Sequence, residues 1–148
     1  MNRGYFEVGV YHPKTETNIG TLWRSANQLG ASGIFTIGAR YHKQSSDTLK
    51  AWRHIPLRCY ETIEQFLSVR PYDCLLIGIE MGGIALDQWE HPERAIYLLG
   101  AEDHGLPEEI QKMCNKVISL RSINTASFNV AVAGSIVMYD RCFRKVQA

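Results

Sequence analysis

Apolar positions along the chain form short continuous runs that alternate with helically spaced stripes. Runs rich in β-branched and aromatic residues, typical of strands buried in a sheet, occur at 5–11, 33–38, 57–60, 72–80, 93–100 and 116–120. Amphipathic spacing or a helix-start signal predicts helices over 18–29, 62–69 and 127–145 and from Pro107 onward. Because strand and helix alternate, we expect a single α/β domain over residues 1–148, with a mainly parallel sheet and helices on both faces.

Polar and glycine residues mark the ends of these elements. Thr17 or Asn18 can cap the first helix, and Gly30 can end it. Ser127 is the predicted N-cap of the last helix. The glycine pair at 82–83 is expected to break the fourth strand.

The composition is that of an ordinary globular protein, with 45% hydrophobic and 21% charged residues and a mean hydropathy of −0.18. No apolar run is long enough to cross a bilayer, and Glu7 interrupts the first apolar stretch, so we expect a cytoplasmic protein without a signal peptide. The four cysteines form no C-x-x-C pair. Their spacing favours buried thiols over a zinc or redox motif, and no metal is expected.

Charge is unevenly distributed along the chain, although the net charge is only +1. Residues 80–109 hold eight acidic side chains against one basic. Residues 40–58 hold one acidic side chain against five basic ones, which are Arg40, Lys43, Lys50, Arg53 and Arg58. The basic segment suits RNA, with Tyr41 or Trp52 available to stack on an unpaired base, but a solvated charged loop explains the charge equally well.

Two common nucleotide-binding signatures, G-x-G-x-x-G and G-x-x-x-x-G-K-[ST], are absent. Gly100 and Gly105 have the glycine spacing of the second, but Leu106 and Pro107 follow them. This segment leaves a buried strand and enters a helix, the place where open α/β sheets bind ligands. Its glycines would let backbone groups approach a flat purine; the alternative is an ordinary strand-to-helix turn.

Two helical segments also carry unusual residues. Gly20 costs the first helix about 1 kcal/mol against alanine, which is reasonable if a backbone or a ligand comes close. Arg24 lies beside the apolar stripe of the same helix. In the last helix, Asn129 needs a polar partner, and small residues keep one face thin, namely Ala131, Ala133, Gly134 and Ser135. Capping, tight packing and an arginine at the edge of the core are the structural alternatives.

These segments occur in the order Asn18 to Arg24, Leu98 to Pro107 and Ser127 to Ile136. Together they resemble the three motifs of the SpoU/TrmH branch of the SPOUT RNA methyltransferases, over almost the whole chain. By size the chain is most similar to minimal members that methylate the tRNA wobble position. The resemblance implies a C-terminal trefoil knot, a rare feature. It also implies S-adenosyl-L-methionine as cofactor, RNA ribose 2′-O-methylation as activity, and a homodimer in which the first motif of one chain reaches the cofactor of the other.

The resemblance also implies two sets of site residues, carried over by matching position. The catalytic set is Asn18, Arg24, Glu102, Ser127 and Asn129. The cofactor-binding set is Gly78, Ile79, Glu80, Gly100, Gly105, Ile118, Leu120 and Ser127. In this arrangement Gly20 and the thin face of the last helix would pack against the partner subunit.

Arg24 is the catalytic arginine that the resemblance implies, and the family proposal makes it a general base. Arginine normally stays protonated, and losing its proton near neutral pH would need a shift of about five pKa units, or about 7 kcal/mol. We therefore expect Arg24 to hold the target phosphate and stabilise the developing alkoxide instead.

Three other functions remain open from the sequence. The first is methylation of ribosomal RNA, which nothing in the sequence excludes. The second is a non-catalytic RNA-binding or cofactor-binding protein on the same scaffold, which the intact motif residues disfavour. The third is an unrelated α/β nucleotide-binding protein. Binding assays with S-adenosylhomocysteine, ATP and NAD would separate these alternatives.

Overall fold

A computed structural model describes residues 4–38, 54–101, 104–124 and 127–144. Within them, one sheet has the strand order β3-β2-β1-β5-β4-β6, and every neighbouring pair is parallel. The strands are β1 (Tyr5–Tyr11), β2 (Gly33–Ile37), β3 (Leu57–Tyr60), β4 (Leu75–Ala85), β5 (Arg94–Leu99) and β6 (Lys116–Ser119). The mainly parallel α/β sheet predicted from the sequence is confirmed.

Helices cover both faces of this sheet, as predicted. They are α1 (Glu16–Gln28), α2 (Ile63–Val69), α3 (Glu108–Met113) and α4 (Val130–Phe143). Side chains of α1 and α4 share one apolar core with strand residues such as Val8. Those of α2 and α3 share a second core with strand residues such as Phe35. Burial on both faces explains why the central strands appear as nearly continuous apolar runs. The trefoil knot stays a prediction.

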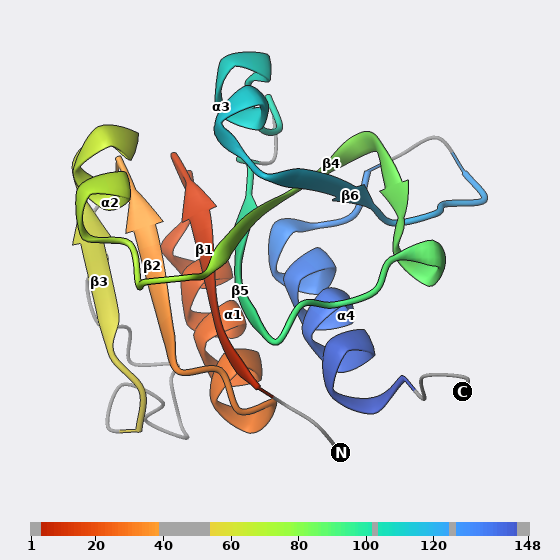
Figure 1. Ribbon diagram of the computed structural model, residues 1–148, viewed down its shortest axis with the longest axis horizontal. Helices are drawn as coiled ribbons and strands as arrows, with labels where there is room; N and C mark the ends of the chain where they lie inside the picture. Colours follow the sequence, from red (N-terminus) through yellow and green to blue (C-terminus); the bar gives the residue numbers. More distant parts are fainter. Residues whose placement is uncertain (1–3, 39–53, 102–103, 125–126, 145–148) are drawn as a thin grey trace.

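The helices α1 and α4 run side by side behind the sheet (Figure 1). Near their starts, Asn129 Nδ2 donates to Asn18 Oδ1 at 3.0 Å, and near their ends Cys142 Sγ contacts Leu29 O at 3.2 Å. The two helices are therefore parallel, and their first turns lie together at the carboxyl edge of the sheet.

The thin face of α4 packs inside its own subunit, so the expectation that it meets a partner was wrong. A Cβ atom at Gly134 would lie 2.6 Å from Leu22 Cδ1 of α1 and 3.2 Å from Leu99 Cδ1 of β5. Ala131 is likewise buried, with 1% of its surface exposed. Small residues on this face let α4 approach both α1 and the sheet closely.

The end of β4 differs from its prediction. The strand continues through the glycine pair at 82–83 to Ala85, and its pairing with β6 shifts register between Ile79 and Ile84. Gly82 has a φ of +88°, which side chains rarely adopt. The glycines therefore form an irregularity within the strand instead of ending it.

The starts of two helices also differ from their predictions. The first helix begins earlier than predicted, with Thr15 as its N-cap, so neither Thr17 nor Asn18 caps it. Pro107 is the N-cap of α3 rather than its first helical residue. Because the first turn of α1 is polar, the spacing of apolar residues does not reveal it, and the helix was therefore predicted to start too late. Gly30 follows α1 with a φ of +81°, as expected for a glycine that ends a helix.

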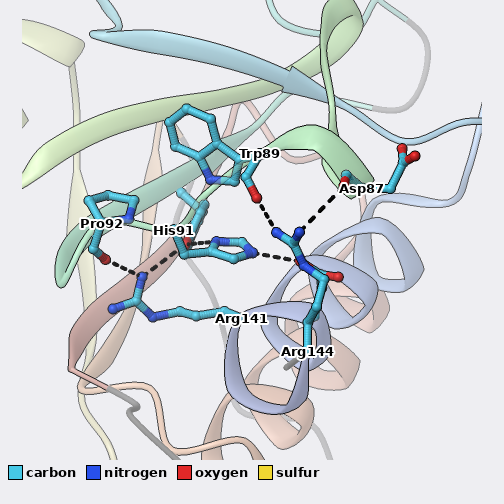
Figure 2. A network of polar contacts seen from close by, with 8 residues as sticks. Asp87, Trp89, His91, Pro92, Arg141 and Arg144 are labelled. Carbon is cyan, nitrogen blue, oxygen red and sulfur yellow. Dashed lines mark hydrogen bonds and ion pairs between the residues drawn. The ribbon is translucent and has the colours of Figure 1, made fainter. Parts of the chain in front are cut away.

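A buried chain of polar contacts fastens the end of α4 to the segment before β5 (Figure 2). Arg141 donates to Pro92 O at 2.7 Å and to Tyr97 Oη at 3.0 Å. His91 lies between Tyr97 Oη, 2.6 Å from its Nδ1, and Asp140 Oδ2, 2.7 Å from its Nε2.

Donor and acceptor chemistry assigns the protons in this chain of contacts. Asp140 is a carboxylate and can only accept, so His91 carries its ring proton on Nε2 and donates it to Asp140, which also accepts from Arg144 Nε at 3.0 Å. Nδ1 of the neutral ring then accepts from the Tyr97 hydroxyl, whose oxygen accepts from Arg141. A second proton on His91 would deprive the Tyr97 hydroxyl of its acceptor.

We predict that this contact makes the stability of the protein depend on pH. Burial lowers the pKa of His91 below its ordinary 6.5, against the opposing effect of Asp140. The native state therefore resists protonation, and the contribution of neutral His91 is present above pH 6.5 and lost as pH falls through the lowered pKa. Urea unfolding between pH 8 and pH 5 measures this loss, which His91→Gln should reduce. The exposed His104 supplies the control, because His104→Gln should leave the pH dependence unchanged.

Candidate functional site

A cavity of about 540 Å³ opens beyond the carboxyl ends of β4, β5 and β6, beside the start of α4. It brings together predicted site residues that are far apart in the sequence, namely Ile79, Glu80, Gly100, Gly105, Leu120 and Ser127. Parallel strands present their carboxyl ends at the same edge, where α/β proteins bind ligands. Six of the predicted cofactor-binding residues therefore line one cavity, and their binding of a cofactor stays a prediction.

The turn after β5 closes tightly on itself. Gly105 N donates to Ala101 O at 2.8 Å, and a Cβ at Gly100 would lie 2.1 Å from Gly105 C. Gly105 itself has a φ of +63°. A side chain at Gly100 would therefore displace the turn, and one at Gly105 would be strained. The backbone that comes close to Gly100 belongs to the same turn, and the expected approach of Gly100 and Gly105 to a flat purine stays a prediction.

Asn129, not Ser127, caps α4. Its Oδ1 accepts from the backbone nitrogens of Ala131 at 2.9 Å and Val132 at 3.2 Å. The prediction for Ser127 was wrong because the helix begins three residues later than its apolar pattern suggests. Asn129 finds its polar partners in its own first turn and in Asn18. Ser127 is exposed instead and lines the cavity.

Asn18 lies beside the cavity, but Arg24 does not line the cavity of its own chain. Asn18 bonds to Asn129, whose neighbours Phe128 and Val130 form part of the cavity wall. Arg24 is exposed and lies about two turns further along α1. Within one chain, the proposed catalytic arginine is therefore separate from the proposed cofactor site.

Two predicted cofactor residues do not line the cavity. Ile118 is fully buried in the core under α1 and α4. Gly78 faces the opposite core, where a Cβ would lie 3.1 Å from Cys114 Sγ. Burial raises the pKa of Cys114 to about 11, so this thiol stays protonated at neutral pH. Glu102, from the catalytic set, lies outside the described residues.

Most of the predicted RNA-binding segment also lies outside the described residues, namely Arg40, Tyr41, Lys43, Lys50, Trp52 and Arg53. Arg58 belongs to β3, which forms the edge of the sheet opposite β6. Its Nη1 lies 3.5 Å from Oε1 of the buried Glu7. Arg58, the member of this basic set that the structure describes, therefore pairs with an acidic side chain of the sheet.

Sequence reasoning missed several side chains of the cavity, which are His104, Ser122, Asn124 and Phe128. They lie in loops without hydrophobic periodicity; His104 and Phe128 are inside the second and third motifs, and Ser122 and Asn124 shortly precede the third. Phe128 is 40% exposed although it is large and apolar. The lining thus combines apolar surface with scattered polar groups, the usual composition of a small-molecule site.

Among the described residues, no cluster of His, Cys, Asp or Glu could hold a metal ion. Within the same residues, no helix has the length and hydropathy needed to cross a membrane.

The fold and the cavity define a parallel α/β protein with a cavity at the carboxyl ends of its strands. Residues 5–139 match the model of the SpoU rRNA Methylase family. Because this match covers most of the chain, the protein belongs to the SpoU family, and the family inferred from the three motifs is confirmed.

Known proteins resemble the chain at moderate to low sequence identity. An uncharacterized tRNA/rRNA methyltransferase of Mycobacterium bovis is 26% identical over 131 residues, which are 82% of this chain and 40% of that protein. The chain therefore spans less than half the length of this relative.

Solved structures share the fold. One of them concerns the 2-OH methylation of C/U34 on tRNA. It matches with a TM-score of 0.83 and 25% identity, over 94% of this chain and 95% of that chain. The SpoU methyltransferase AviRb from Streptomyces viridochromogenes, in complex with AdoMet, matches with a TM-score of 0.82 and 19% identity, over 96% of this chain and 58% of that chain. At that identity, AviRb supports the fold alone.

The two candidate caps of α4 make a direct test of the site geometry. Asn129→Ala removes the acceptor of two backbone N–H groups and should lower the free energy of unfolding by about 1 kcal/mol. Ser127→Ala is the matched control, because Ser127 lies before the helix, and it should leave stability nearly unchanged. Chemical denaturation measures both, and a larger loss from Ser127→Ala would contradict the assignment of the cap.

Proposed function

We propose that this protein is an S-adenosylmethionine-dependent RNA methyltransferase that modifies a ribose 2′-hydroxyl, with tRNA as its substrate, in the cytoplasm. The observation that carries the proposal is the cavity at the carboxyl edge, because segments of all three motifs meet around it or beside it. Membership of the SpoU family supports the same reaction class.

The cavity suits the proposed methyl donor in size and chemistry. About 540 Å³ lies within the usual range of small-molecule sites, about 300–1,000 Å³. Gly100 and Gly105 contribute backbone without side chains, which allows close approach of a planar ring. The tRNA substrate is proposed from the matched structure that concerns 2-OH methylation of C/U34, which has nearly the same length as this chain. The choice of methyl donor is part of the proposal; AviRb, which shares the fold, is in complex with AdoMet.

The chain's own residues would align the ribose and stabilise charge on its oxygen. S-adenosylmethionine, when bound, supplies a methyl group already activated by the sulfonium. Arg24 would hold the phosphate next to the target ribose and stabilise the developing alkoxide, since a guanidinium stays protonated and binds phosphate in a bidentate fashion. Asn18, bonded to Asn129, would fix the start of the helix that carries Arg24. Alignment alone contributes substantially to such a reaction.

The proposed activity is tested by incubating the protein with total RNA and S-adenosylmethionine labelled in its methyl group, followed by nucleoside analysis. We expect label in a 2′-O-methylnucleoside of tRNA. Label in ribosomal RNA would favour the second candidate substrate, and label on a base would contradict ribose methylation. Binding of S-adenosylhomocysteine without any transfer would favour a non-catalytic protein.

A homodimer is the second part of the proposal, and the exposed surface of α4 supports it. Four large apolar side chains follow one face of this helix and are between 36% and 61% exposed; this α4 stripe consists of Val132, Ile136, Tyr139 and Phe143. A groove of about 520 Å³ lies between the stripe and α1, lined by Gln28 and Leu29 among others. Contiguous exposed apolar surface of this kind is typical of a protein interface.

The position of Arg24 connects the proposed dimer to the proposed reaction. Arg24 and Gln28 are one helical turn apart on the exposed face of α1, and Gln28 lines the groove next to the α4 stripe. If a second copy of the chain covered the α4 stripe, Arg24 would therefore lie at the border of the interface. This arrangement would supply the arginine that the cavity lacks within one chain.

Mixing two inactive variants tests whether Arg24 acts in the other subunit. Arg24→Ala should lose methyl transfer while retaining its cavity, and Gly100→Ala should lose it because the new Cβ displaces the turn. After unfolding and refolding together in equal amounts, half of the dimers are mixed, and each holds one intact cavity facing one intact Arg24. Activity should return to about a quarter of the unmodified level.

Each variant refolded alone is the control for this mixture, and both must still fold and form dimers. A mixture that stays inactive although mixed dimers form would mean that Arg24 serves its own chain. A monomeric protein with full activity would exclude the dimer mechanism altogether.

A further inference from the structure

Glu80 contacts the turn after β5 rather than standing free in the cavity. It lies in the irregular part of β4 and lines the cavity. Its Oε2 accepts from Leu106 N at 2.6 Å, and its Oε1 accepts from Met81 N at 3.0 Å. Among the described residues that line the cavity, Glu80 is the only acidic one. Both carboxylate oxygens are thus engaged by backbone donors.

The shape of the turn is matched to this carboxylate. A Cβ atom at Gly105 would lie 2.5 Å from Glu80 Oε2, so the absence of a side chain there makes room for the contact. Leu106 is 2% exposed, and without Glu80 its N–H would lose this acceptor in a buried position. Losing an acceptor under those conditions costs more than losing the same bond at the surface.

The same turn forms a wall of the cavity. Gly100 and Gly105 both line it, and the Gly105 backbone packs directly against Gly100. A shift at Leu106 would therefore move the cavity wall. Among the residues of the turn that the structure describes, the backbone bond from Gly105 N to Ala101 O connects its two arms but does not attach them to β4.

We propose that Glu80 is a positioning residue that attaches the turn at Gly105 and Leu106 to β4 and so forms the methyl-donor cavity before any ligand binds. The inference rests on the proposed function, since the cavity is assigned to S-adenosylmethionine there. A wall already held in place lowers the ordering cost of binding, which increases affinity. Glu80 acts through the backbone of the turn and makes no step of the reaction itself.

The test combines one measurement on the ligand-free protein with one on binding. Amide hydrogen exchange by NMR reports the protection of Leu106 N, and calorimetry reports the dissociation constant of S-adenosylhomocysteine. Glu80→Ala should speed exchange at Leu106 by about tenfold or more and weaken binding by a similar factor. Glu80→Gln keeps one acceptor oxygen and should fall between Glu80→Ala and the unmodified protein.

Two controls separate a local effect from general loss of structure. Glu109→Gln removes a carboxylate from the exposed surface of α3 and should change neither measurement. Exchange at Val8 N, in the fully buried part of β1, should stay constant in every variant. If Val8 exchanges faster in Glu80→Ala, the comparison is made with Glu80→Gln.

Two outcomes would overturn the proposal. Weakened binding with unchanged exchange at Leu106 would mean that Glu80 contacts the ligand directly. Faster exchange with unchanged affinity would mean that the attachment does not shape the cavity. If the unmodified protein binds no S-adenosylhomocysteine, the proposed function fails instead, and exchange at Leu106 still decides whether Glu80 holds the turn.

Discussion

The close approach of α1 to α4 is the contact on which the arrangement of the site depends. Gly134 makes it possible, because any side chain there would collide with Leu22. The two helices then run parallel from a shared start, where Asn18 bonds to Asn129. This contact places the capped end of α4 at the cavity and leaves the α4 stripe exposed next to the helix that carries Arg24.

A second constraint acts at the carboxyl edge of the sheet. Gly100 and Gly105 contribute backbone without side chains to the cavity wall, which elsewhere includes apolar side chains such as Leu99 and Phe128. Hydrogen bonds also hold this wall: Glu80 attaches the turn to β4, and Asn129 fixes the first turn of α4. The opposite end of α4 is held by the buried contacts of His91 and Arg141. The helix is thus fastened at both ends by polar groups and along its length by apolar ones.

Much of the fold followed from local patterns, since buried strands and amphipathic helices have distinct spacings of apolar residues. The errors fall where one local signal allows two structures. A glycine pair at 82–83 is compatible with a strand end or with an irregularity inside a strand. Pairing with β6 continues beyond the glycines, so they form an irregularity inside the strand. Ser127 and Asn129 are equally good caps by residue type, and Asn129 is the cap because the helix begins at Val130.

By itself, the sequence determined the order of strands and helices, the parallel sheet and the family, because periodicity and motif order are properties of neighbouring residues. It also indicated the edge of the sheet at which the site lies. Only the tertiary structure decided that Glu80 meets Leu106, that Asn18 meets Asn129, and that Arg24 does not line its own cavity. Those outcomes depend on distances between residues far apart in the chain, which no local pattern encodes.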